Sequence, residues 1–538
     1  MTAPFILKTE VSFTLRLMRV WPRRASATAA GEAVDAVIVG AGVVGVACAH
    51  YLSRRGARVL IVDSRPPLSY TSAMSTECYR TYFGDHVQMT AFMNRSVDLL
   101  ETRAAECDNA FSLNRRGYCF LSATDEGKAK HVAQAAAAAT LGHTGGAVHK
   151  DGVHGVRYRG DKLAYDAAVD GISVFQGHDA VRSFFGELPA DFVSAETKSL
   201  LHCGRAGWMS AQQMGTQLLL GARAAGARTL TPASVVGVTT ADEGARVSGV
   251  TVQLGADPSA HTHVACGAVV NCAGPFAGEM GELLVRASRP RSLLGATSEA
   301  AANAHARAFT LPFENEIHAK AMLRDPLGAV PMTAPMMIWE DEVELRWTEE
   351  ERTALLEMGG FEATLARPLP GGAHFRPYPG ATGTVVMLWE ALHMDMHVPA
   401  PAPPEPQLRG ALFAELLIRG LSTMVPKLAE CYLADDGSMQ ATVSVDGGYY
   451  TKTPDNLPLI GAVPGAPAGS FVCAGLSGYG VMASNAAGEL LAAHVLGGAG
   501  AAEPPLPSYA ATFRPERWLE SDYIEAVAAG RAGKGLQI

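Results

Sequence analysis

A glycine-rich turn near the start of the chain constrains its fold more than any other feature. Gly40-x-Gly42-x-x-Gly45 directly follows an apolar run at residues 35–39 and directly precedes a helix pattern of small residues. A second strand-like run ends at Asp63, 23 positions after Gly40 (63 − 40). In a βαβ unit such glycines allow a tight turn, close approach of the backbone to a pyrophosphate and close helix packing, while the acid accepts hydrogen bonds from a ribose. A dinucleotide site is predicted; the alternative is a glycine-rich turn in a nucleotide-free α/β domain.

Composition narrows the class of protein further. The chain has 538 residues, of which 48% are hydrophobic and 18% charged, so a globular protein of two or more domains is expected. The net charge is −9 and no basic block marks a nucleic-acid surface. The nine cysteines are scattered without a CxxC pair, which indicates free thiols in a reducing compartment and predicts no metal site. No apolar run is long enough to predict a transmembrane segment.

The first 31 residues differ from the rest of the chain. They are rich in Ser and Thr, contain Glu10 as their single acid, and carry the basic residues Arg16, Arg19, Arg23 and Arg24. This composition is typical of a mitochondrial transit segment. A disordered extension or a misassigned N-terminus are the alternatives, and without a transit segment the protein is expected in the cytoplasm.

Strand and helix patterns alternate along most of the chain. Apolar residues recur at helical spacing over residues 87–105, and Ser210 and Gln213 have the spacing of a capping box for a helix that ends near Ala225. Strand-like runs lie at residues 226–230, 233–238, 247–254, 268–274, 314–323 and 384–389. The alternation predicts an α/β fold with a parallel sheet.

Four segments in this order resemble the D-amino-acid oxidase/sarcosine oxidase/glycine oxidase family of FAD-dependent amine oxidoreductases. They are the fingerprint at residues 35–63, the N-C-A-G-P-F-A run at 271–277, the T-K-T-P-D-N-L-P-L-I-G run at 451–461, and the glycine-rich turn and helix at 474–489. The resemblance implies a Rossmann-type FAD-binding domain and a second, mixed α+β substrate domain.

The resemblance also divides the chain into segments. Residues 32–110, 206–285 and 441–498 are expected to form the FAD-binding domain, and residues 111–205 and 286–440 the substrate domain. An inserted surface loop is expected at 286–310, inside the substrate domain, and a peripheral C-terminal tail at 499–538.

The cofactor residues that the resemblance implies come from all four segments and from the polar loop after Asp63. Val235 matches the strand whose backbone meets the adenine, although a core valine is an equal alternative. The cofactor-binding candidates are Gly40, Gly42, Gly45, Asp63, Ser72, Ser75, Thr76, Val235, Ala273, Gly274, Gly475, Gly478, Gly480 and Val481.

Two departures from the family pattern carry information. Gly448 stands where a flavin-tethering cysteine occurs in monomeric sarcosine oxidases, and residues 71–80 contain no histidine, with Cys78 as their only soft nucleophile. FAD is therefore expected to bind without a covalent bond. Gly478 and Met482 stand where basic residues that hold a substrate carboxylate would align. Either the carboxylate is held from elsewhere, or the substrate is not a simple α-amino acid.

Candidates for the substrate side come from the second domain and the flavin motifs. Glu316, His318 and Lys320 alternate along one predicted strand and so share a face, for which a merely solvated face is the alternative. His374 and Arg376 have the same geometry, and Tyr449 lies beside the flavin motif. Arg80 matches an arginine that follows the polar loop near the flavin. The catalytic candidates are Arg80, His318, Lys320 and Tyr450.

The reaction that the resemblance implies is oxidation of a C–N bond in a small amine or amino acid, with hydride transfer to flavin N5. Either oxygen or an electron carrier would reoxidise the flavin, and Lys320 is the one candidate for an oxygen-activating lysine. A second hypothesis is a mitochondrial FAD-containing assembly factor that binds respiratory complex I proteins with little or no turnover. A nicotinamide-dependent enzyme is a third, against which the two C-terminal motifs argue.

Overall fold

The computed structural model describes most of the chain, with gaps between ranges. The described residues are 33–140, 146–149, 156–160, 164–167, 171–288, 309–378, 383–393, 396–435, 437–497 and 505–532. The transit-like segment at 1–31 and most of the loop expected at 286–310 lie outside these ranges.

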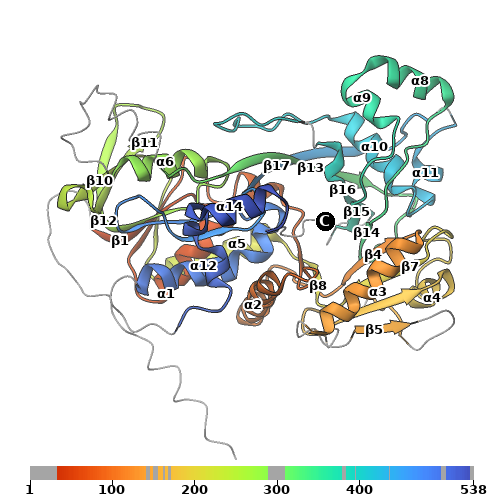
Figure 1. Cartoon of the computed structure of the whole chain (residues 1–538), viewed down its shortest axis with the longest axis horizontal. Coiled ribbons are helices and arrows are strands. Elements are labelled where there is room, and N and C mark those ends of the chain that lie inside the picture. The colour runs from red at the N-terminus through yellow and green to blue at the C-terminus, as the bar shows by residue number, and fades with distance from the viewer. Residues whose placement is uncertain are drawn as a thin grey trace, which may run out of the picture.

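An eight-stranded sheet forms one half of the molecule (Figure 1). Its order is β10-β11-β12-β1-β2-β9, with β19 paired to β12 and β18 paired to β19. The strands are β1 (Val34–Val39), β2 (Val59–Val62), β9 (Arg228–Leu230), β10 (Ala233–Ala241), β11 (Arg246–Leu254), β12 (His261–Asn271), β18 (Leu459–Ala462) and β19 (Ser470–Ala474). β1 pairs in parallel with both β2 and β12, and β12 with β19, which confirms the predicted parallel sheet.

Four helices pack together beside this sheet: α1 (Val43–Arg54), α2 (Val87–Glu106), α5 (Ala211–Ala224) and α12 (Gly480–Gly497) (Figure 1). Ser210 caps α5 by accepting a hydrogen bond from the backbone N–H of Gln213, as its spacing predicts. Val37, Ile38 and Val46 have no exposed surface, so β1 and α1 are held in the core. This rigid packing fixes the turn between them.

A nine-stranded sheet forms the other half. Its order is β17-β13-β16-β15-β14-β4-β7-β6-β5. The strands are β4 (Tyr118–Ser122), β5 (Gly146–His149), β6 (Ile172–Gln176), β7 (Ser199–Cys203), β13 (Glu314–Arg324), β14 (Met336–Trp339), β15 (Ala373–Pro377), β16 (Thr384–Leu388) and β17 (Val443–Lys452). Figure 1 shows α8 (Glu349–Met358), α9 (Gly360–Leu365), α10 (Ala411–Leu421) and α11 (Lys427–Tyr432) at one end of this half, and α3 (Asp125–Thr140) and α4 (His178–Phe184) at the other.

Two long strands connect the halves. β13 and β17 pair antiparallel from Glu314 opposite Lys452 to Leu323 opposite Val443, and in Figure 1 they run from the nine-stranded sheet toward the other half. The hydrogen bonds of β17 therefore place it in the nine-stranded sheet, although the sequence analysis assigns residues 441–498 to the FAD-binding domain. The reason is the ten-residue ladder with β13, which no local motif reveals.

The C-terminal segment, expected to be peripheral, packs into the protein where it is described. It contains α13 (Ala510–Phe513) and α14 (Ser521–Ala528). Phe513 is fully buried, and the Arg517 guanidinium forms a buried ion pair with Asp455, with 2.7 Å between Nε and Oδ2. Asp455 belongs to the motif at 451–461, so the segment neutralises a buried carboxylate that would otherwise be costly.

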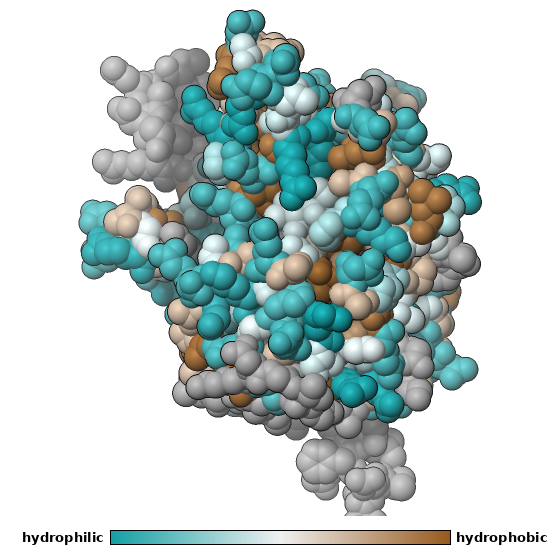
Figure 2. Space-filling model, turned by 90° about the vertical axis from the view of Figure 1, so that its right-hand side faces the viewer, coloured by the Kyte–Doolittle hydropathy of each residue, from teal (hydrophilic) through white to brown (hydrophobic). Residues whose placement is uncertain are grey.

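The surface over the nine-stranded half is largely hydrophilic, with apolar residues in small separate groups (Figure 2). Such scattered apolar residues are ordinary for a surface in contact with water. In the described part of the chain, none of the helices combines the length and apolarity that crossing a membrane requires.

Candidate active site

A cavity of about 700 Å³ lies at the carboxyl ends of β1, β2, β12 and β19, and β13 and β17 form its opposite side. The carboxyl edge of a parallel sheet is where α/β proteins bind nucleotides, because helix N-termini and loops meet there. The two halves of the molecule therefore both contribute side chains to one cavity.

The first glycine turn forms the floor of the cavity. Gly40 has φ +107°, which favours glycine, and a Cβ there would overlap the carbonyl oxygen of Cys272. A Cβ at Gly45 would overlap the carbonyl oxygen of Gly40, while one at Gly42 would lie 3.2 Å from Ser72 Oγ. Gly40 and Gly42 line the cavity, whereas Gly45 lies behind the turn and lets α1 pack against it.

Asp63 ends β2 beside this turn. One carboxylate oxygen, Oδ2, accepts a hydrogen bond of 2.6 Å from the backbone N–H of Ala41, and Oδ1 accepts one of 2.8 Å from Arg65. The carboxylate is thus fixed against the glycine turn and lines the cavity, in the position that the fingerprint predicts for a ribose-binding acid.

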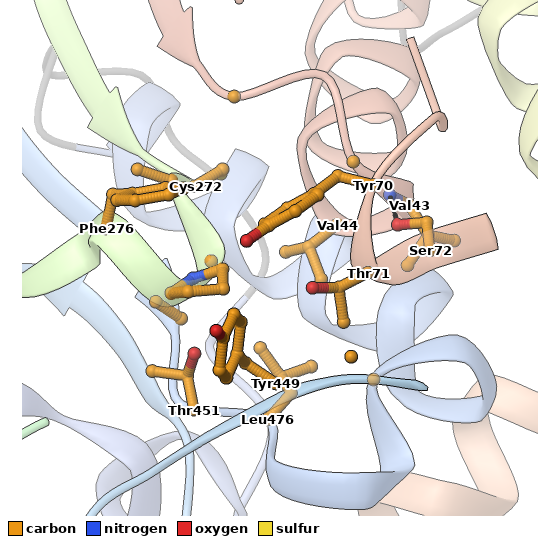
Figure 3. Close-up of a pocket in the computed structure, with 18 of the residues that line it drawn as sticks. Val43, Val44, Tyr70, Thr71, Ser72, Cys272, Phe276, Tyr449, Thr451 and Leu476 are labelled. Atoms are coloured by element: carbon orange, nitrogen blue, oxygen red, sulfur yellow. Dashed lines mark hydrogen bonds between the residues drawn. The ribbon is translucent and has the colours of Figure 1, made fainter. Parts of the chain in front are cut away.

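The polar loop after Asp63 covers the cavity. Its 3₁₀ turn at Thr71–Met74 is held by Ser72, whose Oγ accepts a 2.9 Å hydrogen bond from the Val43 N–H at the start of α1 (Figure 3). Ser75 and Thr76 continue along the wall of the cavity. The loop is therefore attached to the same helix N-terminus that faces the cavity.

Two hydroxyl groups face this cavity without partners. The buried hydroxyls of Thr71 and Tyr449 make no hydrogen bond within the described structure, and Figure 3 shows both side chains directed into the space that Tyr70 and Phe276 border. Buried polar groups in proteins are almost always hydrogen-bonded. The donor and acceptor positions therefore suit a ligand with several polar groups, such as a dinucleotide.

The remaining predicted cofactor residues come together in the same cavity. Its lining includes Val235, Ala273, Gly274, Gly475, Gly478, Gly480 and Val481. Helix α12 begins at Gly480, so a second helix N-terminus also faces the cavity. We call the first glycine turn, the polar loop 71–76 and the turn 475–481 the cradle.

The aromatic part of the lining was not predicted from the sequence. Tyr70 and Phe276 stack with ring centroids 6.1 Å apart, and the Arg65 guanidinium lies 4.2 Å from the centre of the Tyr70 ring. All three line the cavity. The position of Arg65, two residues after the fingerprint acid, and that of Phe276, inside the N-C-A-G-P-F-A run at 271–277, were available signals, whereas no motif marks Tyr70.

The other end of the cavity is formed by side chains of β13 and β17. His318 and Tyr450 stack with centroids 3.5 Å apart and an interplanar angle of 13°, and both line the cavity together with Lys320. Lys320 forms an ion pair with Asp446 and donates a 3.0 Å hydrogen bond to the Met74 carbonyl. We call His318, Lys320 and Tyr450, with the acids that contact them, the charged wall.

Carboxylates flank His318 on both ring nitrogens. Glu316 lies 3.4 Å from Nε2, and Glu390 lies 3.5 Å from Nδ1. The hydrogen bond with His318, together with Lys452, lowers the pKa of Glu316 to about 2, whereas burial raises the pKa of Glu390. Burial also raises the pKa of the Tyr450 hydroxyl, so that group stays neutral.

Three of the candidates lie behind the cavity lining. Arg80 is buried in β3 (Cys78–Arg80), with its guanidinium 4.7 Å from the centre of the Phe83 ring. His374 is buried on β15, and Arg376 donates 2.8 Å and 3.0 Å hydrogen bonds to the Thr76 carbonyl and the Glu77 carboxylate. None of the three lines the cavity. Arg80 was expected near the flavin, but β3 directs its guanidinium to the Phe83 ring behind the cavity.

These features define a class: a dinucleotide-binding α/β protein whose cofactor cradle faces a separate wall of titratable side chains. Residues 35–494 match the family model of FAD dependent oxidoreductases. The chain belongs to that family and is an FAD-dependent oxidoreductase.

Solved structures share the fold at low sequence identity. L-proline dehydrogenase from P. horikoshii superimposes with a TM-score of 0.61 at 18% identity, covering 91% of this chain and 98% of the other. Glycine oxidase from Geobacillus kaustophilus superimposes with a TM-score of 0.59 at 17% identity, covering 89% of this chain and 98% of the other. L-amino acid deaminase from Proteus vulgaris superimposes with a TM-score of 0.60 at 14% identity, covering 92% of this chain and 99% of the other. No curated protein sequence matches this chain.

Proposed function

We propose that this protein oxidises a C–N bond of a small amine. The observation that carries the proposal is that His318, Lys320 and Tyr450 line the same cavity as the cradle, from the opposite side. FAD supplies the hydride acceptor, N5, and water hydrolyses the resulting imine. The chain's own residues supply binding, orientation and the protonation state of the amine.

The charges of the wall favour a substrate that is recognised through its nitrogen. Lys320 is neutralised by Asp446, and His318 is flanked by Glu316 and Glu390. Among the described residues at this end of the cavity, the Lys320 ammonium therefore already has an anionic partner and the His318 ring lies between two carboxylates, whereas a carboxylate substrate needs a cation that is free to bind it. An amine without a clamped α-carboxylate fits this wall better than a simple α-amino acid does.

His318 is the proposed proton acceptor for an incoming ammonium group. Its ring is held flat against Tyr450 and between two acids, so its orientation is fixed before substrate arrives. Hydride removal requires the neutral amine, and a positioned imidazole contributes about 10²–10⁴-fold to such a proton transfer. Lys320 is proposed to position the polar loop through the Met74 carbonyl.

We further propose that FAD is bound without a covalent tether. Gly448 offers no nucleophile, and Cys78 is buried with its thiol donating to the Thr76 carbonyl at 3.2 Å. Cys78 does not line the cavity. Denaturation in trichloroacetic acid should release all of the flavin into the supernatant, and flavin that stays with the precipitated protein would contradict this proposal.

The test is an anaerobic titration of the flavin-loaded protein with sarcosine, dimethylglycine, proline, a series of amines without a carboxylate, and D- and L-amino acids. We expect bleaching of the flavin band by an amine without an α-carboxylate, and loss of that bleaching in His318→Ala but not in His261→Ala on the exposed part of β12. Readmission of air then separates an oxidase from a dehydrogenase. A yellow protein that none of these compounds bleaches would overturn the proposal.

The same compensated charges favour one alternative, a mitochondrial FAD-containing assembly factor for respiratory complex I with little or no turnover. In that case the wall preserves a fold rather than a substrate site. A mitochondrial location, which residues 1–31 suggest, suits both proposals. Imaging of the full chain fused to a fluorescent protein tests the location, and co-purification with complex I subunits in the absence of amine turnover supports the alternative.

A further inference from the structure

Three cysteines that are far apart in the sequence meet below the cradle. Cys48 lies on α1, Cys272 follows β12, and Cys473 lies on β19. All three are buried, with exposed fractions of 0%, 6% and 1%. The sulfur atoms of Cys48 and Cys272 are 3.7 Å apart, and both thiols are within hydrogen-bonding reach of the Cys473 sulfur. The amine chemistry proposed above uses none of them.

Cys272 and Cys473 are neighbours across two parallel strands. The ladder between β12 and β19 pairs Asn271 with Val472, and these cysteines are the next residue on each strand. Adjacent strands lie about 4.8 Å apart, which is inside the range of Cα separations of about 4.4–6.8 Å that a disulfide spans. Both cysteines line the cavity, whereas Cys48 does not.

The environment of the cluster distinguishes one sulfur from the other two. Hydrogen bonds from Cys272 and Cys48 lower the pKa of Cys473, while burial raises the pKa of Cys48 and Cys272. A thiolate is the nucleophilic form of cysteine. Cys473 is therefore suited to react first, with Cys272 beside it as the resolving thiol.

We propose that Cys272 and Cys473 form a thiol pair that a hydroperoxide oxidises to a disulfide when FAD does not cover this part of the cavity. The Cys473 sulfur attacks the peroxide, an S–O bond forms, the O–O bond breaks, and an alcohol or water leaves. The Cys272 thiol then attacks the sulfenic acid, the S–S bond forms, the S–O bond breaks and water leaves. Two thiols lose two electrons and two protons in total, and the peroxide is reduced.

This disulfide would affect cofactor binding because Cys272 shapes the first glycine turn. Its carbonyl oxygen occupies the space next to Gly40, and its Cβ lies 3.5 Å from the position of a Cβ at Gly45. Both cysteines line the cavity, so a disulfide with its sulfur atoms about 2.05 Å apart changes the surface that FAD meets there. Oxidation is therefore expected to lower FAD affinity, and bound FAD to protect the thiols. This inference rests on FAD binding and does not depend on amine oxidation.

The test treats the full-length protein with hydrogen peroxide, with FAD bound and after FAD has been removed by dialysis against bromide. Remaining thiols are alkylated under denaturing conditions and the peptides are identified by mass spectrometry. In the FAD-free protein we expect a linked pair of peptides that contain Cys272 and Cys473, formed at least about tenfold faster than in the loaded protein, as expected for site-selective thiol oxidation. Cys266 is the internal control, because it is buried on the same strand without a neighbouring thiol.

Two variants make the outcome specific. Cys473→Ser should abolish the linked peptides and leave Cys272 alkylatable, whereas Cys266→Ser should leave the cross-link unchanged. Flavin fluorescence then measures whether the oxidised protein rebinds FAD more weakly than the dithiothreitol-treated protein. The proposal is overturned if Cys272 and Cys473 stay as alkylatable as Cys266 in the FAD-free wild type, or if the disulfide forms equally fast with FAD bound.

Discussion

The cradle and the charged wall face each other across one cavity but are built on different physical principles. The cradle uses backbone groups, helix N-termini and glycines, several of which lie where a Cβ would meet neighbouring protein atoms. The wall uses long charged side chains on β13 and β17, and each charge there has a partner. In the cradle, an added side-chain atom at Gly40 or Gly45 would overlap backbone. In the charged wall, side chains can change without loss of the fold as long as the charges stay balanced. Substitutions in the cradle should therefore change FAD affinity more than substitutions in the wall do.

Gly45→Ala should have the largest effect. Its methyl group would overlap the Gly40 carbonyl oxygen, which is backbone and has no room to move. We expect FAD affinity to fall by more than about 100-fold, or about 2.7 kcal/mol, measured by flavin fluorescence titration. Gly278→Ala is the matched control, because a Cβ there meets nothing within 4 Å. Equal affinity in both variants would contradict the role of the turn.

Asp63→Ala should have the next largest effect on the cradle. It removes the acceptor of the Ala41 and Arg65 N–H groups and the carboxylate that lines the cavity. Loss of hydrogen bonds to a charged group costs about 1.5–3 kcal/mol, so FAD affinity should fall by about 10–100-fold in the same titration. Asp242→Ala, on the surface beside β10, should bind FAD like the wild type. An unchanged affinity in Asp63→Ala would remove this acid from the cofactor site.

Lys320→Met tests whether the wall and the cradle are energetically separate. Lys320 donates to the Met74 carbonyl of the polar loop, so its loss should weaken FAD binding by about tenfold through that loop. Asp446→Asn leaves the lysine donor in place and should change FAD affinity less than about threefold. If both variants bind FAD like the wild type, the contact of Lys320 with the polar loop does not contribute to FAD binding.

A pH series on His374→Gln should show the smallest effect. Burial lowers the pKa of His374 from 6.5 to about 4, so the unfolded chain takes up a proton at higher pH than the folded protein does. The neutral histidine therefore contributes stability that is fully present above pH 6.5 and is lost as the pH falls toward 4.

Urea unfolding at pH 7 and pH 5 measures this contribution. Between pH 7 and pH 5, the unfolding free energy of the wild type should fall by about 1–2 kcal/mol more than that of His374→Gln. His261→Gln, exposed on β12, should follow the wild type. A variant whose unfolding free energy falls as steeply as that of the wild type would show that His374 does not account for the loss.

The first glycine turn of the cradle could be predicted from the sequence, because its motif is local. A strand, a glycine turn and a helix within residues 35–63 specify their own geometry, since the permitted backbone angles and close contacts depend on neighbours in the chain. The tight turn at Gly40, the Ser210 cap and the position of Asp63 beside that turn follow from such local patterns.

Long-range contacts set the wall, the thiol cluster and the position of the C-terminal segment. The alternation along β13 predicts that His318 and Lys320 share a face, but not that Asp446 neutralises one and Glu390 flanks the other. Likewise, Cys272 and Cys473 are 201 positions apart (473 − 272) and meet through a strand register. These contacts depend on long-range pairing of strands, and side-chain charge and burial are set by neighbours that no local spacing in the sequence identifies.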